Sequence, residues 1–127
     1  MLQAMTRPPG RVLVVDDDPG IRTMLELALG QAGYTVTTSD GRTGLEPGGA
    51  DVVLLDARLG DRSAVEPAFR RLLESGPPVV VMTAGSDAAG VARTIGAAAS
   101  ITKPFDLDLL FATIERCRDS ARQLRSS

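Results

Sequence analysis

The chain has 127 residues, of which 43% are hydrophobic and 24% charged, and these values predict one globular domain with a filled core. Its single cysteine, Cys117, excludes an internal disulfide, and the absence of histidine excludes ordinary zinc sites and Ser-His or Cys-His catalytic pairs. The net charge of −2 argues against direct nucleic-acid contact, and the lack of a membrane span or secretory signal predicts a cytoplasmic protein without membrane contact.

Five short β-type runs alternate with helical segments, and Gly, Pro, Asp or Ser bounds each run. The runs cover residues 11–15, 34–38, 51–55, 78–82 and 98–101. The first, third and fourth are continuously apolar, as strands covered on both faces are. We expect residues 1–10 to be a disordered N-terminal segment, and residues 11–124 to form the domain.

Apolar residues at helical spacing predict the connecting helices. The first helix is indicated by Ile21, Met24, Leu25, Ala28 and Leu29, with Asp18 as its N-cap and Gly33 as its C-cap. A second is indicated by Val65, Ala68, Phe69, Leu72 and Leu73, with a capping box of Ser63 and Glu66. The last has Leu107, Leu110, Phe111, Ile114 and Ala121 on one side and Cys117 at its margin. Residues 42–46 and 86–95 predict two weaker helices.

This alternation predicts a doubly wound α/β domain, with a five-stranded parallel sheet and helices on both faces. In such sheets ligands bind outside the carboxyl ends of the strands. The side chains expected there are Asp16, Asp17, Asp56, Thr83 and Lys103.

Three carboxylates at one sheet edge need a compensating charge, because two of them about 4 Å apart repel by roughly 4 kcal/mol at an effective dielectric near 20. An oxygen-only site of this kind suits Mg²⁺ and leaves room for water and phosphate. A carboxylate in such a site can accept a phosphoryl group. Lys103 is the only lysine beside thirteen arginines, and a cis Lys103-Pro104 bond would direct it over the strand ends.

The segments VLVVDDDPGIR, DVVLLDARLG, VVVMTAG and ITKPF together resemble the receiver domain of two-component response regulators, over about residues 11–122. The resemblance implies a flavodoxin-like fold with strand order 2-1-3-4-5. It makes Asp56 the phosphoacceptor, Asp17 a direct Mg²⁺ ligand and Asp16 a ligand mainly through water. By the same resemblance, Arg58 gives its backbone carbonyl to the metal, Thr83 binds the phosphoryl group and Lys103 pairs with it.

The sequence departs from the family pattern in several places. ArgLeuGly follows Ala57 where the family usually has Met-Pro-Gly, and the segments of the second to fourth helices are short. Ser100 stands where an aromatic residue commonly couples to the threonine in switching, and Ala98 and Ala99 stand where acidic residues are common. The acceptor chemistry is therefore expected, but the usual signal path from Thr83 is not.

The leading hypothesis is a switch phosphorylated by a sensor histidine kinase or a histidine phosphotransfer protein, since this chain has no histidine of its own. It is not expected to be a turnover enzyme, although it can catalyse its own phosphorylation and dephosphorylation. We expect a monomer or a homodimer that forms on phosphorylation. One alternative is a receiver-like binding module that signals without phosphorylation. Another, a phosphatase of the haloacid-dehalogenase type, is disfavoured because DDDPG replaces its DxD motif followed by Thr or Val.

Overall fold

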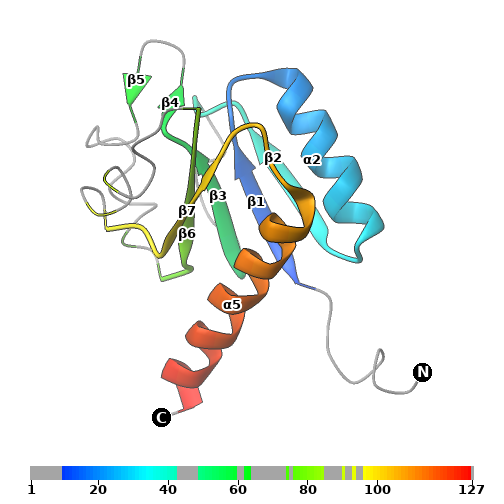
Figure 1. Ribbon diagram of the computed structural model, residues 1–127. Coiled ribbons are helices and arrows are strands. Elements are labelled where there is room, and N and C mark those ends of the chain that lie inside the picture. Colours follow the sequence, from blue (N-terminus) through cyan, green and yellow to red (C-terminus); the bar gives the residue numbers. More distant parts are fainter. Residues whose placement is uncertain are drawn as a thin grey trace.

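A computed structural model describes residues 10–42, 49–59, 62–63, 74, 76–84, 90, 93 and 96–126. A five-stranded parallel sheet forms its centre, with strand order β2-β1-β3-β6-β7 (Figure 1). The strands are β1 (Arg11–Val15), β2 (Thr35–Ser39), β3 (Val52–Asp56), β6 (Val79–Thr83) and β7 (Ala99–Thr102). The predicted α/β class and the order 2-1-3-4-5 are confirmed.

Four of the five strands lie one residue later than predicted, and only β1 has the predicted bounds. The predicted third and fourth strands ended at their last apolar residues, Leu55 and Met82, whereas the ladder is made by the backbone and extends into polar residues. Asp56 pairs with Met82, and Thr83 pairs with Thr102. Asp56 and Thr83 are therefore the last residues of β3 and β6 and do not follow them.

The helix α2 (Pro19–Gln31) has the predicted N-cap. Asp18 has extended backbone angles, and its side chain accepts hydrogen bonds from the backbone nitrogens of Gly20 at 2.8 Å and Ile21 at 3.4 Å. At the other end Ala32 is the C-cap, one residue before the predicted Gly33. Gly33 follows with φ +101°, a conformation that glycine adopts without steric cost. The local sequence thus sets both ends of the helix.

Removing this cap provides a test of the helix start. Asp18→Ala is expected to lower the free energy of unfolding by about 1 kcal/mol, because two backbone donors lose their acceptor. Asp18→Asn retains a side-chain oxygen and is expected to keep most of the stability. Urea unfolding followed by circular dichroism measures both variants, and equal losses would show that the cap is not what stabilises this end.

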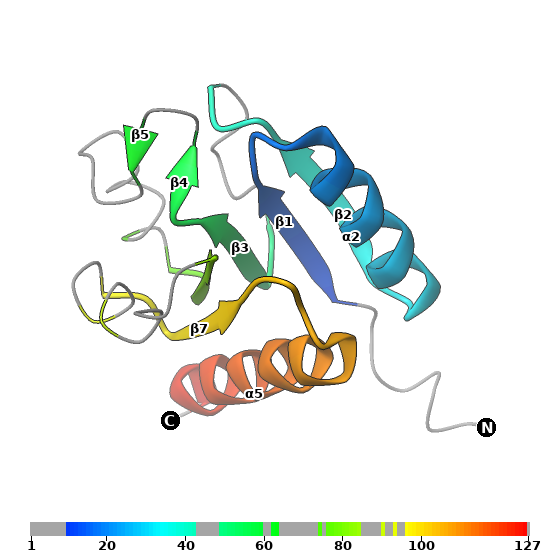
Figure 2. The same cartoon turned by 45° about the horizontal axis from the view of Figure 1, so that its top comes forward.

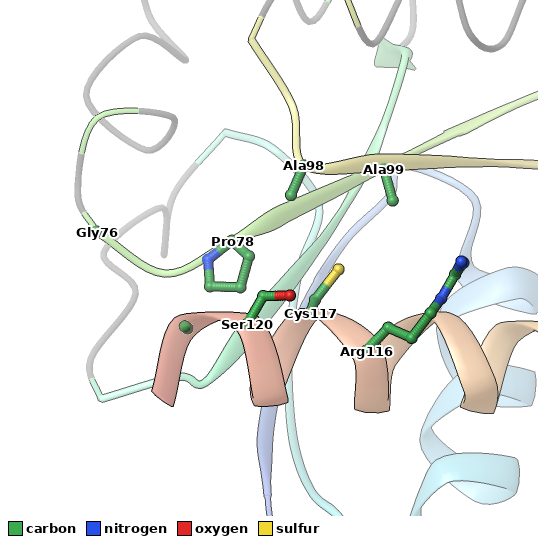
Figure 3. A pocket seen from close by; sticks show the side chains of 8 residues that line it. Gly76, Pro78, Ala98, Ala99, Arg116, Cys117 and Ser120 are labelled. Carbon is green, nitrogen blue, oxygen red and sulfur yellow. The ribbon is translucent and has the colours of Figure 1, made fainter. Parts of the chain in front are cut away.

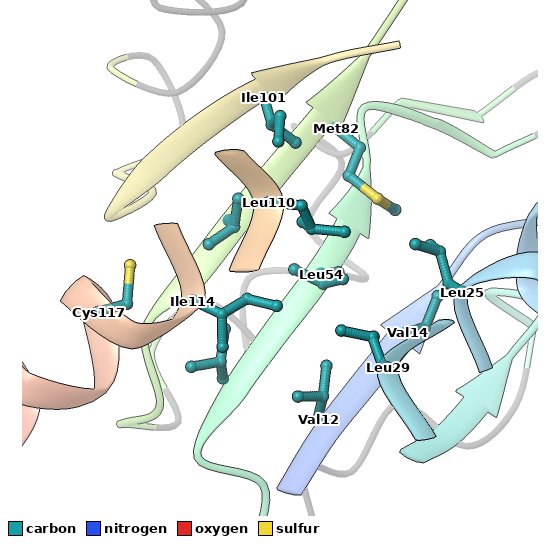
Figure 4. Packing of buried hydrophobic residues seen from close by; sticks show 12 residues of the cluster. Val12, Val14, Leu25, Leu29, Leu54, Met82, Ile101, Leu110, Ile114 and Cys117 are labelled. Atoms are coloured by element: carbon teal, nitrogen blue, oxygen red, sulfur yellow. The ribbon is translucent and has the colours of Figure 1, made fainter. Parts of the chain in front are cut away.

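The helices α2 and α5 (Leu107–Ser126) pack on the same face of the sheet (Figures 1 and 4). Their core residues include Leu25, Leu29, Leu110 and Ile114, each fully buried. Leu107 is 39% exposed, so its predicted place on the buried side of the last helix is wrong. Leu107 is the first residue of α5 and is absent from the core cluster on this face of the sheet.

The opposite face of the sheet carries its own apolar cluster, which is made of Leu13, Val15, Val53, Leu55 and Val79. Three predicted helices lie wholly or mostly outside the described residues, namely those over residues 42–46, 65–73 and 86–95. Glu66 of the expected capping box lies outside them as well. Ser63 belongs to a short strand instead. Among the residues that the structure describes, no helix combines the length and apolar character that a bilayer crossing requires.

A polar cluster ties α5 to the start of β2. The hydroxyl of Tyr34 donates to the carboxylate of Glu115, and Arg118 donates to the same oxygen at 2.9 Å. The Arg118 guanidinium also lies 6.0 Å from the centre of the Tyr34 ring. Burial and the neighbouring Glu115 raise the pKa of Tyr34 from 10.0 to about 12.

This shift has a predictable pH dependence. The folded state holds the Tyr34 proton more tightly than the unfolded state, so its contribution to stability is complete below pH 10 and is lost as the pH rises toward 12. Tyr34 is the only tyrosine, so the ultraviolet absorbance of tyrosinate reports it alone. We expect the titration midpoint to fall toward 10 in Glu115→Gln. An equal midpoint in both proteins would contradict the role of Glu115.

Candidate metal centre

Three carboxylates converge at the carboxyl edge of the sheet, as predicted. One oxygen from each of Asp16, Asp17 and Asp56 lies within 4.8 Å of the others. Asp16 and Asp17 follow β1, and Asp56 ends β3, which pairs directly with β1. Asp16 is fully buried, Asp56 is 7% exposed, and Asp17 is exposed. The pocket therefore has a buried wall and one carboxylate that faces solvent.

Every polar atom of Asp16 has a partner within the protein. Its backbone nitrogen donates to the Ser39 carbonyl at 3.0 Å, and its own carbonyl accepts from Arg22 Nη1 at 2.7 Å. In the side chain, Oδ1 accepts from the backbone nitrogen of Asp18 at 2.9 Å, and Oδ2 accepts from Lys103 Nζ at 2.9 Å. Asp16 is thus held rigidly, as its full burial requires.

Lys103 lies between the two buried carboxylates. Its Nζ is 2.9 Å from Asp16 Oδ2 and 3.4 Å from Asp56 Oδ1. Burial alone would lower the pKa of Lys103, but the hydrogen bond to Asp16 and the charges of Asp56 and Asp16 outweigh it, and the net shift is upward. The Lys103-Pro104 peptide bond is cis, as predicted. The lysine is therefore charged and belongs to the acidic pocket.

Thr83 lies at the same edge of the sheet, one strand further along. It is 9% exposed, and its carbonyl accepts from the backbone nitrogen of Lys103 at 2.8 Å. This bond continues the pairing of β6 with β7 beyond Thr102 and brings the Lys103 backbone next to Thr83. The structure thus gathers the predicted pocket residues Asp16, Asp17, Asp56, Thr83 and Lys103 at one edge.

The chain after Asp56 forms an antiparallel hairpin that the sequence did not predict. Its strands are β4 (Arg58–Leu59) and β5 (Arg62–Ser63), and Arg58 pairs with Ser63 (Figure 2). The backbone nitrogen of Ala57 donates to the Met82 carbonyl at 2.8 Å, which extends the β3–β6 ladder to the foot of the hairpin. The Arg58 backbone, which was predicted to supply a metal ligand, is thus part of a paired strand. It lies two residues after Asp56.

The remaining unusual positions lie in and beside β7, away from this pocket. Ser100 is half-buried and pairs with Val81. Ala98 and Ala99 border a cavity of about 470 Å³ between α5 and the amino ends of β6 and β7, where Cys117 and Ser120 face Pro78 and Ala98 (Figure 3). Burial raises the pKa of the Cys117 thiol, and nearby Arg116 opposes this in part. Cys117 is accordingly a packing residue of the core, as expected.

The donor chemistry of the pocket fits a hard divalent cation. Asp16, Asp17 and Asp56 offer only oxygen atoms, which Mg²⁺ prefers, and the three carboxylates with the one ammonium of Lys103 carry a formal charge of −2. Asp17 on the exposed side leaves access for water and a ligand. Sequence reasoning missed Arg22, although an arginine near the start of a helix was a detectable signal, because the helix dipole disfavours positive charge there.

Comparison with known proteins identifies the family of this domain. The family model of the response regulator receiver domain matches residues 12–115. Curated relatives include the transcriptional regulatory protein GlrR of Escherichia coli K12, 35% identical over 118 residues, and the DNA-binding transcriptional regulator NtrC of the same strain, 41% identical over 115 residues. These alignments cover 87% and 84% of this chain but 27% and 24% of the relatives, so the chain spans about a quarter of their length.

Solved structures share the fold. The chemotaxis protein CheY4 of Vibrio cholerae matches with a TM-score of 0.73 and 28% identity, covering 86% of this chain and 98% of that one. NtrX of Brucella abortus matches with a TM-score of 0.81 and 26% identity, covering 93% and 29%. The domain is thus a flavodoxin-like α/β module of the CheY-like kind. The chain belongs to the family of response regulator receiver domains, which act in two-component systems and are not usually classed as enzymes.

Proposed function

We propose that Asp56 accepts a phosphoryl group in a Mg²⁺-dependent reaction and that the resulting charge switches a protein-protein interaction surface. The observation that carries the proposal is the convergence of Asp56 with Asp16 and Asp17 within 4.8 Å, beside an ammonium 3.4 Å from Asp56. Phosphoryl transfer asks a protein mainly for positioning and neutralisation of charge. This pocket offers both at the end of a buried strand.

Each pocket residue has a role in this proposal. Asp17, Asp56 and the backbone carbonyl of Arg58 would hold the metal, and Asp16 would act mainly through water. The bound ion supplies neutralisation of charge on the phosphoryl oxygens. Lys103 exchanges its contact with Asp56 for one with the phosphoryl group, and the Thr83 hydroxyl donates a hydrogen bond to it. The burial of Asp56 and its contact with Lys103 support this assignment.

The transfer itself forms one bond and breaks one bond. An Asp56 carboxylate oxygen attacks phosphorus, and the bond from phosphorus to the donor nitrogen breaks, so the donor imidazole leaves with the electron pair. The family supports a sensor histidine kinase or a histidine phosphotransfer protein as the donor, and the cytoplasm as the compartment. This chain spans about a quarter of the length of these relatives, whose names describe transcriptional regulators. A downstream effector is therefore part of the proposal, without a named output.

A small phosphodonor tests the proposal directly. The protein is incubated with Mg²⁺ and acetyl phosphate, and intact mass spectrometry is expected to show one added phosphoryl group that is absent in Asp56→Ala and absent when the metal is chelated. No adduct under conditions that label an ordinary receiver domain would favour a module that signals without phosphorylation. Labelling that survives Asp56→Ala but is lost in Asp16→Ala would place the nucleophile after β1.

A further inference from the structure

Arg22 occupies a position that the helix itself disfavours. It lies in α2 close to its start at Pro19, and its backbone nitrogen donates to the Asp18 carbonyl at 3.1 Å, in the first hydrogen-bonded turn. Positive charge at this end of a helix opposes the helix dipole. Its guanidinium instead reaches back to the carbonyl oxygen of Asp16, with Nη1 at 2.7 Å. A residue that conflicts with a local preference is expected where a functional site requires it.

The contact falls on the peptide that joins the two acidic residues after β1. The carbonyl of Asp16 and the nitrogen of Asp17 share one planar peptide unit, so a bond to that oxygen restricts the orientation of the Asp17 backbone. Asp16 is fully buried, and its carbonyl needs a donor. Asp17 is exposed, so its direction depends on its backbone more than on side-chain packing.

We propose that Arg22 is a positioning residue of the metal site: through the Asp16 carbonyl it fixes the peptide that aims Asp17 at the pocket shared with Asp56. The inference rests on the proposed function, because it takes Asp17 as a ligand of the cation. Groups that orient metal ligands typically contribute about 10–100-fold to metal affinity. Arg22 would act on the backbone next to the ligand Asp17, and α2 contains no other arginine.

Whether Mg²⁺ affinity rises or falls when Arg22 is removed distinguishes a positioning role from a purely electrostatic one. Removing a positive charge near an acidic pocket would by itself strengthen the binding of a cation, because it removes repulsion. Losing the contact that holds the Asp17 backbone would instead weaken cation binding. A variant that has neither the charge nor the donors therefore gives opposite results under the two explanations.

The experiment measures Mg²⁺ affinity by isothermal titration calorimetry for the parent chain and matched variants. Arg22→Met keeps an unbranched side chain without donors and is expected to weaken Mg²⁺ binding by about 10-fold or more. Arg22→Lys retains a donor and is expected to lose about threefold, because a compact ammonium lacks the planar fork of arginine. Arg116→Met and Arg116→Lys make the same changes at an exposed position beside the cavity at the other end of the sheet, and are expected to bind as the parent does.

Unchanged or tighter Mg²⁺ binding in folded Arg22→Met, with the parent binding normally, would overturn the inference and leave the proposed function intact. Circular dichroism identifies variants that do not fold. Should Arg22→Met be one of them, the comparison of Arg22→Lys with Arg116→Lys decides, and equal affinities would overturn the inference. A parent chain that neither binds Mg²⁺ nor accepts phosphate would instead contradict the proposed function.

Discussion

Replacing Lys103 by methionine is expected to lower the free energy of unfolding by about 3 kcal/mol in metal-free buffer. The substitution keeps an unbranched side chain of similar length but removes the ammonium that lies between Asp16 and Asp56. Both carboxylates are at least nine-tenths buried, so water cannot compensate for the loss. Breaking a buried ion pair typically lowers stability by about 3–5 kcal/mol. We expect the lower value here because the Lys103 side chain is 19% exposed.

Magnesium is expected to restore much of this stability. A cation that binds only the folded state stabilises it by mass action, and it would do so more strongly where the lysine no longer offsets the carboxylates. Thermal unfolding of the parent and of Lys103→Met, each with and without Mg²⁺, measures the difference. Arg116→Met controls for the loss of one positive charge at an exposed position. Equal stability of Lys103→Met and the parent without metal would show that Lys103 does not compensate these carboxylates.

The strand order and the acidic edge were predictable from sequence because both depend on short local patterns. Continuous apolar runs such as VVLL identify buried strands, and the polar residue after each run must lie at the carboxyl edge of a parallel sheet. This pattern predicts that Asp16, Asp17 and Asp56 meet at one edge, as the structure shows. It placed four strands one residue too early. In β3 and β6 the pairing continues through Asp56 and Thr83 although their side chains are polar.

Contacts between distant residues were beyond sequence reasoning. The family resemblance pairs Lys103 with phosphate, but in the structure Lys103 contacts Asp16, 87 residues away, at 2.9 Å. The contact of Arg22 with the Asp16 carbonyl spans only six residues, but it forms across the turn from β1 into α2. The unfavourable charge of Arg22 near a helix start was readable from the sequence, whereas its partner was not. The hairpin at Arg58 escaped prediction for a different reason: two-residue strands are too short to show alternation of apolar and polar residues.

Two neighbouring carboxylates are expected to differ sharply when each is replaced by asparagine. Asp17→Asn is expected to weaken Mg²⁺ binding by about 100-fold. Loss of a group that only orients a metal ligand costs about 10–100-fold, and loss of a proposed ligand is expected to cost at least as much as the upper value. In metal-free buffer Asp17→Asn is not expected to lower stability, because Asp17 is exposed and the change removes one of three mutually repelling carboxylates. Calorimetric titration with Mg²⁺ and urea unfolding in metal-free buffer provide the two measurements.

Asp16→Asn is expected to destabilise the domain by about 2–3 kcal/mol as well as weakening metal binding. Both carboxylate oxygens of Asp16 accept hydrogen bonds, one from the Asp18 backbone nitrogen and one from Lys103. An amide has only one oxygen, so its NH₂ group must face one of these two donors. Glu26→Gln removes one exposed negative charge from α2 and controls for net charge. Equal stability losses at positions 16 and 17 would contradict this division between a buried anchor and an exposed ligand.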